Sequence, residues 1–116
     1  MVNSIQNLCH NTLKNLHDAT GDVFYEILTI YIDGAITNIN ALKLALKEND
    51  TDQLLRLAHT LKGSSRNVGA SKTAQLCESF EKILRDNEQC DFQNHIDLIQ
   101  SSYETSLPLL RKYLNH

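Results

Sequence analysis

One proline, four glycines and no tryptophan occur in the 116 residues of this sequence. Proline and glycine are the residues that most often interrupt regular structure, so their scarcity predicts long unbroken elements. No segment shows the strict alternation of apolar and polar residues that is typical of strands, and we find no internal repeat or low-complexity segment. These absences favour an all-helical fold.

An excess of basic residues is also missing, because 11 Lys and Arg face 14 Asp and Glu, for a net charge of −3 at pH 7. This balance gives no electrostatic footprint for nucleic acid, so we expect no nucleic-acid partner. The N-terminal residues contain no basic stretch followed by an apolar run, and polar residues break the apolar stretches elsewhere. We therefore expect no signal peptide, no membrane-spanning segment and a cytoplasmic location.

Cysteines are few, and their number is odd. Cys9, Cys77 and Cys90 are irregularly spaced, which argues against a disulfide framework or a structural zinc site. We expect free thiols, with Cys77 in the core because its neighbours are apolar. Cys9 with His10 and His17 is a weak alternative metal site, since no carboxylate or second cysteine lies at a matching spacing. We expect no metal and no cofactor.

The apolar residues recur with helical periodicity in five segments. We predict helices over residues 4–17, 22–48, 52–67, 72–87 and 92–114. Four long helices joined by short connections predict an antiparallel up-down four-helix bundle, with the short first helix as a lid. A chain of this length suits a single core, so we expect residues 1–116 to form one domain.

The connections carry their own signals. Gly21 is free to take a positive φ in the first turn. Asp50 or Thr51 can cap the third helix, and Ser71 is the expected N-cap of the fourth. Pro108 removes one backbone donor from the last helix and can bend it.

His59 lies on the third predicted helix, away from its apolar face. Successive residues are displaced by about 100° around an α-helix. Leu57, Leu61 and Val68 then lie on nearly the opposite side from His59. The spacing therefore predicts that the imidazole points to solvent.

The helix face around His59 is rich in cations. Arg56 lies three residues before it, and Lys62 and Arg66 lie three and seven residues after it. Nearby cations disfavour the imidazolium and favour a dianionic phosphoryl group on the ring. Leu55, four residues before His59, is expected to be exposed on the same face and to meet a docking partner.

Gly63 lies one turn after His59. A mid-helix glycine costs roughly 1 kcal/mol relative to alanine, so it favours a position that another molecule approaches closely. Simpler interpretations stay open. An exposed histidine is often an ordinary surface residue, Lys62 and Arg66 are compatible with a solvated face, and Gly63 is compatible with tight packing of a neighbouring helix.

The segment AHTLKGSSRNVGASKTAQLCESFE resembles the signature of histidine phosphotransfer (HPt) domains. The matching features are His59, the run Leu61–Ser65, the pair Gly69–Ala70 and the stretch Cys77–Glu81. The turn Thr20–Asp22 and the apolar second helix also resemble that family, so the resemblance covers nearly the whole chain. It implies a four-helix bundle whose histidine accepts a phosphoryl group from the aspartate of one receiver domain and passes it to another.

The resemblance also implies roles for the neighbours of the histidine. Lys62 matches a lysine that offsets phosphate charge, and Gly63 matches a glycine that admits the partner. Ser64 and Ser65 match small residues that let the two central helices pack closely.

Some members of the family place a glutamine near the histidine from the next helix. Glu81 aligns with that glutamine, and Arg85 follows one turn later. A carboxylate at this position can orient the second ring nitrogen, but it also repels phosphate. The role of Glu81 therefore stays open.

The function implied by the resemblance is that of a monomeric phosphocarrier without autokinase activity. Its expected partners are response-regulator receiver domains and a hybrid sensor kinase, and Mg²⁺ is expected on the receiver. A histidine kinase dimerisation domain is one alternative, although such domains usually have an acidic residue after the histidine and a later proline, whereas Thr60 follows His59 and no proline precedes Pro108. A helical adaptor that binds a receiver without being phosphorylated is the other.

Overall fold

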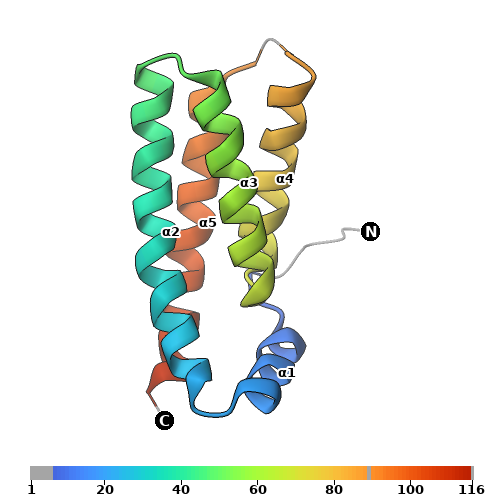
Figure 1. The fold of residues 1–116 in the computed structure, drawn as a ribbon, viewed down its shortest axis with the longest axis vertical. Helices are drawn as coiled ribbons and strands as arrows, with labels where there is room; N and C mark the ends of the chain where they lie inside the picture. The colour runs from blue at the N-terminus through green and yellow to red at the C-terminus, as the bar shows by residue number, and fades with distance from the viewer. Residues whose placement is uncertain (1–6, 89, 116) are drawn as a thin grey trace.

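The structure is a computed structural model that describes residues 7–88 and 90–115. Within these ranges it contains five helices and no strand (Figure 1). The helices are α1 (His10–Thr20), α2 (Val23–Lys47), α3 (Thr51–Asn67), α4 (Ser71–Arg85) and α5 (Phe92–Leu114). None of these helices is long and apolar enough to cross a membrane.

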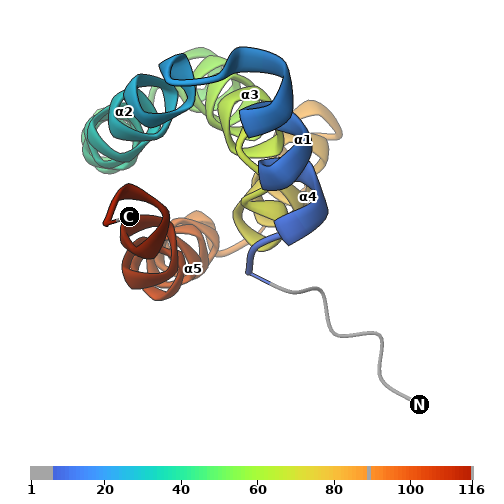
Figure 2. The same ribbon diagram turned by 90° about the horizontal axis from the view of Figure 1, so that it is seen from below.

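Helices α2 to α5 form the predicted antiparallel up-down bundle. Each helix packs against the next, and α5 returns to α2, so that the four helices close into a ring. Figure 2 shows this ring from below, with α1 lying across one end. The predicted all-helical bundle with a short additional N-terminal helix is therefore confirmed.

The core follows from the spacing of the apolar residues. On α2 the buried side chains recur every three or four residues, so they form one stripe along the helix. This stripe consists of Phe24, Leu28, Tyr31, Ala35, Ile39, Leu42 and Ala45. On α4, Cys77 is fully buried as predicted, and burial, its largest influence, raises the pKa of the thiol to about 12.

Aspartate side chains cap two of the helix N-termini, Asp50 at α3 and Asp91 at α5. Asp50 accepts a hydrogen bond from the backbone N–H of Gln53 at 3.1 Å, which confirms one of the two caps predicted for α3. The prediction that Ser71 caps α4 is wrong, because Ala70 occupies the N-cap and Ser71 is already helical. The chain turns one residue earlier than predicted, with Gly69 at a φ of +72°.

The predicted first helix, residues 4–17, is shifted in the structure. Residues 4–6 lie outside the described ranges, residues 7–9 are not helical, and α1 continues to Thr20. The backbone N–H of Cys9 donates to the carbonyl of Gly69 at 2.7 Å. This long-range bond ties residues before α1 to the turn between α3 and α4, which sequence periodicity does not reveal. Gly21 takes the expected positive φ of 60°.

Candidate functional site

His59 lies in the middle of α3 and faces solvent. Its side chain is 63% exposed, whereas Leu61 and Val68 on the other side of the helix are buried. Leu57 is half-buried. The exposure predicted from helical spacing is therefore what the structure shows.

One ring nitrogen of His59 is already engaged. Nδ1 lies 3.0 Å from Oε2 of Glu81, which comes from the neighbouring helix α4. The Glu81 side chain is only 2% exposed, so a buried carboxylate holds an exposed imidazole. The sequence alone leaves the role of Glu81 open, whereas the structure places its carboxylate against the histidine.

Two cations accompany this carboxylate. Nζ of Lys62 lies 2.8 Å from Oε1 of Glu81, and a guanidinium nitrogen of Arg85 lies 2.6 Å from Oε2. The ammonium of Lys62 and the carboxylate of Glu81 thus form an ion pair between α3 and α4. Burial by itself raises the pKa of Glu81, but its contacts with Lys62 and His59 and the charge of Arg85 outweigh burial and lower that pKa below its ordinary value.

The ionised state of Glu81 determines which nitrogen of His59 is available. A carboxylate accepts hydrogen bonds and cannot donate them, so Nδ1 is the donor in its contact with Glu81. In the neutral ring Nε2 then carries the lone pair. The site therefore presents a largely exposed imidazole with its lone pair on Nε2, and Glu81 fixes the orientation of the ring through Nδ1.

Gly63 leaves open space one turn from His59. A Cβ built at Gly63 would meet no heavy atom of the described residues within 4 Å, apart from the backbone of its own helix turn. The alternative that Gly63 permits tight packing of a neighbouring helix is therefore wrong. The absence of a side chain here uncovers the approach to the imidazole.

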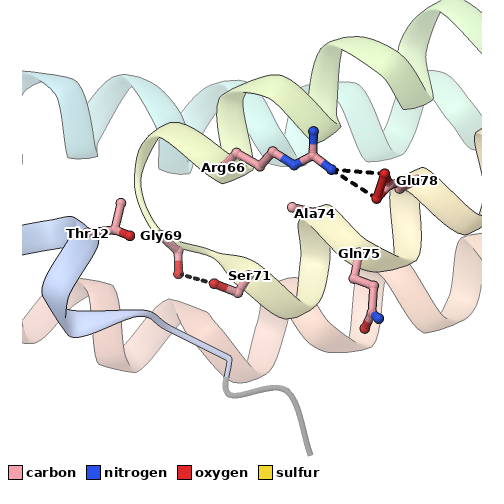
Figure 3. A pocket seen from close by; sticks show the side chains of 7 residues that line it. All are labelled: Thr12, Arg66, Gly69, Ser71, Ala74, Gln75 and Glu78. Atoms are coloured by element: carbon pink, nitrogen blue, oxygen red, sulfur yellow. Dashed lines mark hydrogen bonds and ion pairs between the residues drawn. The ribbon is translucent and has the colours of Figure 1, made fainter.

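The two arginines predicted beside His59 bond elsewhere. Arg66 makes two hydrogen bonds to Glu78 on α4, at 3.0 and 2.9 Å, beside a pocket of about 320 Å³ (Figure 3). Arg56 donates to Gln53 on its own helix. Because α4 lies along α3, the carboxylate of Glu78 faces Arg66, whereas Arg56 is held within its own helix by Gln53.

The remaining predicted residues support the site from within the bundle. Leu55 is half-buried and packs against the core, which corrects the expectation that it is exposed. Ser65 is fully buried, and its hydroxyl shares a hydrogen bond of 2.9 Å with the hydroxyl of Tyr31 on α2. Ser64 is half-buried and donates to the carbonyl of Leu61.

The weak alternative metal site is not assembled. His10 contacts the hydroxyl of Tyr113, and the ring of His17 stacks on Phe24 at 4.6 Å. Residues 7–88 and 90–115 contain no group of three or more His, Cys, Asp or Glu that could hold a metal ion.

A groove between α2 and α3 was not predicted in detail. It has a volume of about 490 Å³, and Ile30, Gly34 and Asn38 on α2 and Thr60 and Ser64 on α3 are among its lining residues. Ile30 is 69% exposed. An isoleucine outside the buried stripe of α2, one turn before a mid-helix glycine, is the sequence signal that points to this groove.

Comparison with known proteins identifies relatives of the chain. The family model described as "Hpt domain" matches residues 26–113. Histidine-containing phosphotransfer protein 5 of Arabidopsis thaliana is 33% identical over 86 residues, which are 71% of this chain and 51% of the relative. Histidine-containing phosphotransfer protein 1 of rice (Oryza sativa subsp. japonica) is 29% identical over 94 residues, 78% and 64% of the two chains. The chain thus spans about half to two thirds of the length of these relatives.

Solved structures share the fold. Histidine-containing phosphotransfer protein B (HptB) of Pseudomonas aeruginosa superposes with a TM-score of 0.91 at 23% identity, covering 97% of each chain. MtHPt2, a histidine-containing phosphotransfer protein of Medicago truncatula, gives a TM-score of 0.75 at 25% identity, covering 93% of this chain and 76% of that chain. With a family model that matches well over half of its residues, the chain belongs to the Hpt domain family.

Proposed function

We propose that this chain is a phosphocarrier that accepts a phosphoryl group on His59 from a receiver-domain aspartate and passes it to another receiver in a phosphorelay. The observation that carries the proposal is the state of the imidazole. Nδ1 is held by Glu81, the His59 side chain is largely exposed, and Gly63 one turn away carries no side chain that could cover it. The names of the relatives, all histidine-containing phosphotransfer proteins, support the same function.

The reaction is an in-line displacement at phosphorus. Nε2 of His59 attacks the aspartyl phosphate of a docked receiver, the P–N bond forms, and the P–O bond to the aspartate breaks. Such a transfer depends on positioning and on stabilising charge rather than on further covalent chemistry. Glu81 positions the nucleophile, and Gly63 lets the receiver come close enough for the phosphorus to lie in line.

Cations on this chain offset part of the phosphoryl charge. Lys62 and Arg85 both reach Glu81, and of these two Arg85 is the more exposed, at 58% against 15%. Arg85 is therefore better placed to meet phosphoryl oxygens that arrive from solvent, whereas Lys62 acts from inside the cluster.

The receiver is proposed to dock on the face that contains His59 and the groove between α2 and α3. The exposed Ile30 offers this partner an apolar contact, and Thr60 connects the groove to the histidine. Mg²⁺ is proposed to come with the receiver. We further propose that the chain acts as a monomer in the cytoplasm, receives its phosphoryl group from a hybrid sensor kinase through that kinase's receiver, and has no autokinase activity.

Transfer from a labelled receiver tests the proposal. Wild type should take up label that is acid-labile and base-stable, as expected for phosphohistidine, and His59→Gln should take up none. His10→Gln, which removes an exposed histidine on α1, is the matched control and should be labelled like wild type. Uptake of label by His59→Gln would show that another residue accepts the phosphoryl group.

The two alternatives make different predictions. A non-phosphorylated adaptor would bind the receiver without taking up label, and His59→Gln would leave signalling unchanged. A kinase dimerisation domain would be a dimer, so a solution mass of twice the chain mass would favour it over the proposed monomer. The match to the Hpt family model supports the phosphocarrier over both.

A further inference from the structure

Gly34 lies in the middle of α2, where the packing of the bundle does not require a glycine. The residue is exposed, and a Cβ built there would meet no heavy atom of the described residues within 4 Å, apart from the backbone of its own helix turn. Its φ is not positive, so no turn demands a glycine either. Because a mid-helix glycine is destabilising relative to alanine, the reason for Gly34 lies outside the fold.

Gly34 lines the groove of about 490 Å³ between α2 and α3, two helices that lie side by side in the bundle (Figure 1). Ile30 and Asn38, four residues before and after Gly34, line the groove from the same row of α2. Thr60 and Ser64 form the facing row on α3. The two rows border a channel along the helix axes, and at Gly34 the α2 row has no side chain.

This arrangement matches a hole in helix packing. In knobs-into-holes packing, one side chain enters a space that four residues of the facing surface enclose. The four residues here are Ile30 and Gly34 on α2 and Thr60 and Ser64 on α3. Ile30, which is 69% exposed, supplies an apolar wall. The missing side chain of Gly34 deepens the hole, so that it can take a large knob.

A helix of the receiver domain is the occupant that this groove fits. Thr60 follows His59 directly in the chain, so the groove continues into the proposed transfer site, and a partner that reaches His59 covers both. A channel that runs along two helix axes suits an amphipathic helix. Of the described residues that line the groove, Asp33 alone carries a charge, so the side chain that enters beside Gly34 should be apolar.

We propose that Gly34 is a specificity-determining residue, because the space that it leaves takes a large apolar side chain, such as leucine or phenylalanine, from the docking helix of the receiver. The inference rests on the proposed function, and within it on the docking of a receiver. Gly63 and Gly34 then differ in what they do. Gly63 admits the phosphoryl donor to His59, whereas Gly34 selects which receiver docks.

Selection follows from how an apolar anchor contributes to binding. A few side chains that fill pockets at the centre of an interface account for most of its affinity. A receiver with a small residue opposite Gly34 leaves the hole unfilled, and one with a charged residue there has to desolvate the charge. Both therefore bind more weakly than a receiver that presents a large apolar residue.

Binding and phosphoryl transfer are measured separately on the full chain. The probe is a set of isolated, unphosphorylated receiver domains, and calorimetric titration gives the dissociation constant of each. Gly34→Leu fills the hole completely, and Gly34→Ala fills it in part. Asn40→Leu is the matched control, because Asn40 is exposed on the same helix and is not among the residues that line the groove.

Receivers that bind wild type should bind Gly34→Leu roughly thirtyfold more weakly, the loss expected when an anchor is excluded. They should bind Asn40→Leu as they bind wild type. Gly34→Ala should bind several-fold more weakly although its melting temperature rises by about 4 °C, since alanine favours the helix.

A change on the receiver side completes the test. Each large apolar residue on the surface helices of the receiver is replaced by alanine in turn. One of these replacements should weaken binding to wild type but cause no further loss with Gly34→Leu, because both changes remove the same contact. Additive losses for every replacement would overturn the inference.

Equal affinities of wild type and Gly34→Leu would also overturn the inference. A lower melting temperature of Gly34→Ala would do the same, because the fold itself would then require the glycine. If Gly34→Leu does not fold, an unchanged affinity of Gly34→Ala decides against the inference. If no receiver binds wild type, the inference and the proposed function both fail. If receivers bind with the expected losses but none labels His59, the relay function fails and the inference about Gly34 stands.

Discussion

At the scale of single residues, Gly63 shows how stability is given up for access. Its missing Cβ leaves open space above α3, because a Cβ there would meet no heavy atom within 4 Å among the described residues outside its own helix turn. Ala there would raise helix propensity, while any longer side chain would stand between His59 and an approaching receiver. A side chain at this position is therefore expected to raise the stability of the fold and, when it is long, to slow phosphoryl transfer.

We predict that Gly63→Ala stabilises the fold by about 0.5–1 kcal/mol, measured by thermal or urea unfolding. Gly63→Leu should also fold but slow transfer from a receiver by about a hundredfold, because a displaced donor loses its in-line geometry. Ser101→Leu on α5, also at an exposed helical position, is the control that should leave transfer unchanged. Unimpaired transfer to Gly63→Leu would show that the receiver does not approach over this residue.

The residues of the site differ in how far the sequence could predict them. The exposure of His59 followed from helical spacing, because the apolar residues of its helix lie on the other side. The contacts of Arg66 and Glu81 did not follow from helical spacing. They depend on how α4 packs against α3, and the spacing of residues within one helix does not specify how two helices pack. Sequence placed Arg66 near His59, whereas the structure pairs it with Glu78.

At the scale of elements, the helix bodies were predictable and their ends were not. The range predicted for α5 agrees with the structure, and those for α2 and α3 agree to within one residue at each end. The start of α1 was wrong because the bond from Cys9 to Gly69 crosses sixty residues of sequence, and the cap of α4 was wrong because the turn at Gly69 comes early. Local patterns specify helices, while long-range contacts decide where they stop.

Gly69 is the residue on which this long-range contact depends. It has a φ of +72°, and a Cβ there would lie 2.8 Å from the carbonyl oxygen of Cys9. We predict that Gly69→Ala lowers the free energy of unfolding by about 1–3 kcal/mol, measured in urea. Asn67→Ala, an exposed helical position two residues earlier, should change it by less than about 0.5 kcal/mol. Equal effects would mean that the turn tolerates a side chain.

The pairing of α3 with α4 through Glu81 predicts a pH dependence. Burial raises the pKa of Glu81, but the combined effect of Lys62, His59 and Arg85 is larger and opposite. The pKa of Glu81 therefore lies below its ordinary value of 4.5. A carboxyl whose folded-state pKa is depressed stabilises the fold above its unfolded value, and that stability is lost as pH falls through the folded-state value. Urea midpoints measured from about pH 6 down to about pH 3 should therefore fall less in Glu81→Gln than in wild type. Parallel curves for the two proteins would contradict this account of the contact.

At the scale of the whole molecule, the four helices of the bundle share one core, and Cys77 reports on its opening. Its thiol is fully buried, and burial raises its pKa to about 12, so almost no reactive thiolate is present at neutral pH. We predict that a thiol reagent modifies the exposed Cys90 in the native protein and reaches Cys77 only on unfolding. Labelling of Cys77 should then rise in step with urea unfolding. Fast labelling without denaturant would show that the core opens locally.

The bundle holds Nδ1 of His59 against the buried carboxylate of Glu81, so the proposed function predicts that the phosphoryl group is attached to Nε2. The most direct measurement is ³¹P–¹⁵N NMR of the ¹⁵N-labelled protein after phosphorylation by a receiver domain. We predict a single phosphorus signal coupled to Nε2 of His59, with Nδ1 still protonated. Phosphorus on Nδ1, on another residue, or on no residue at all would contradict the account.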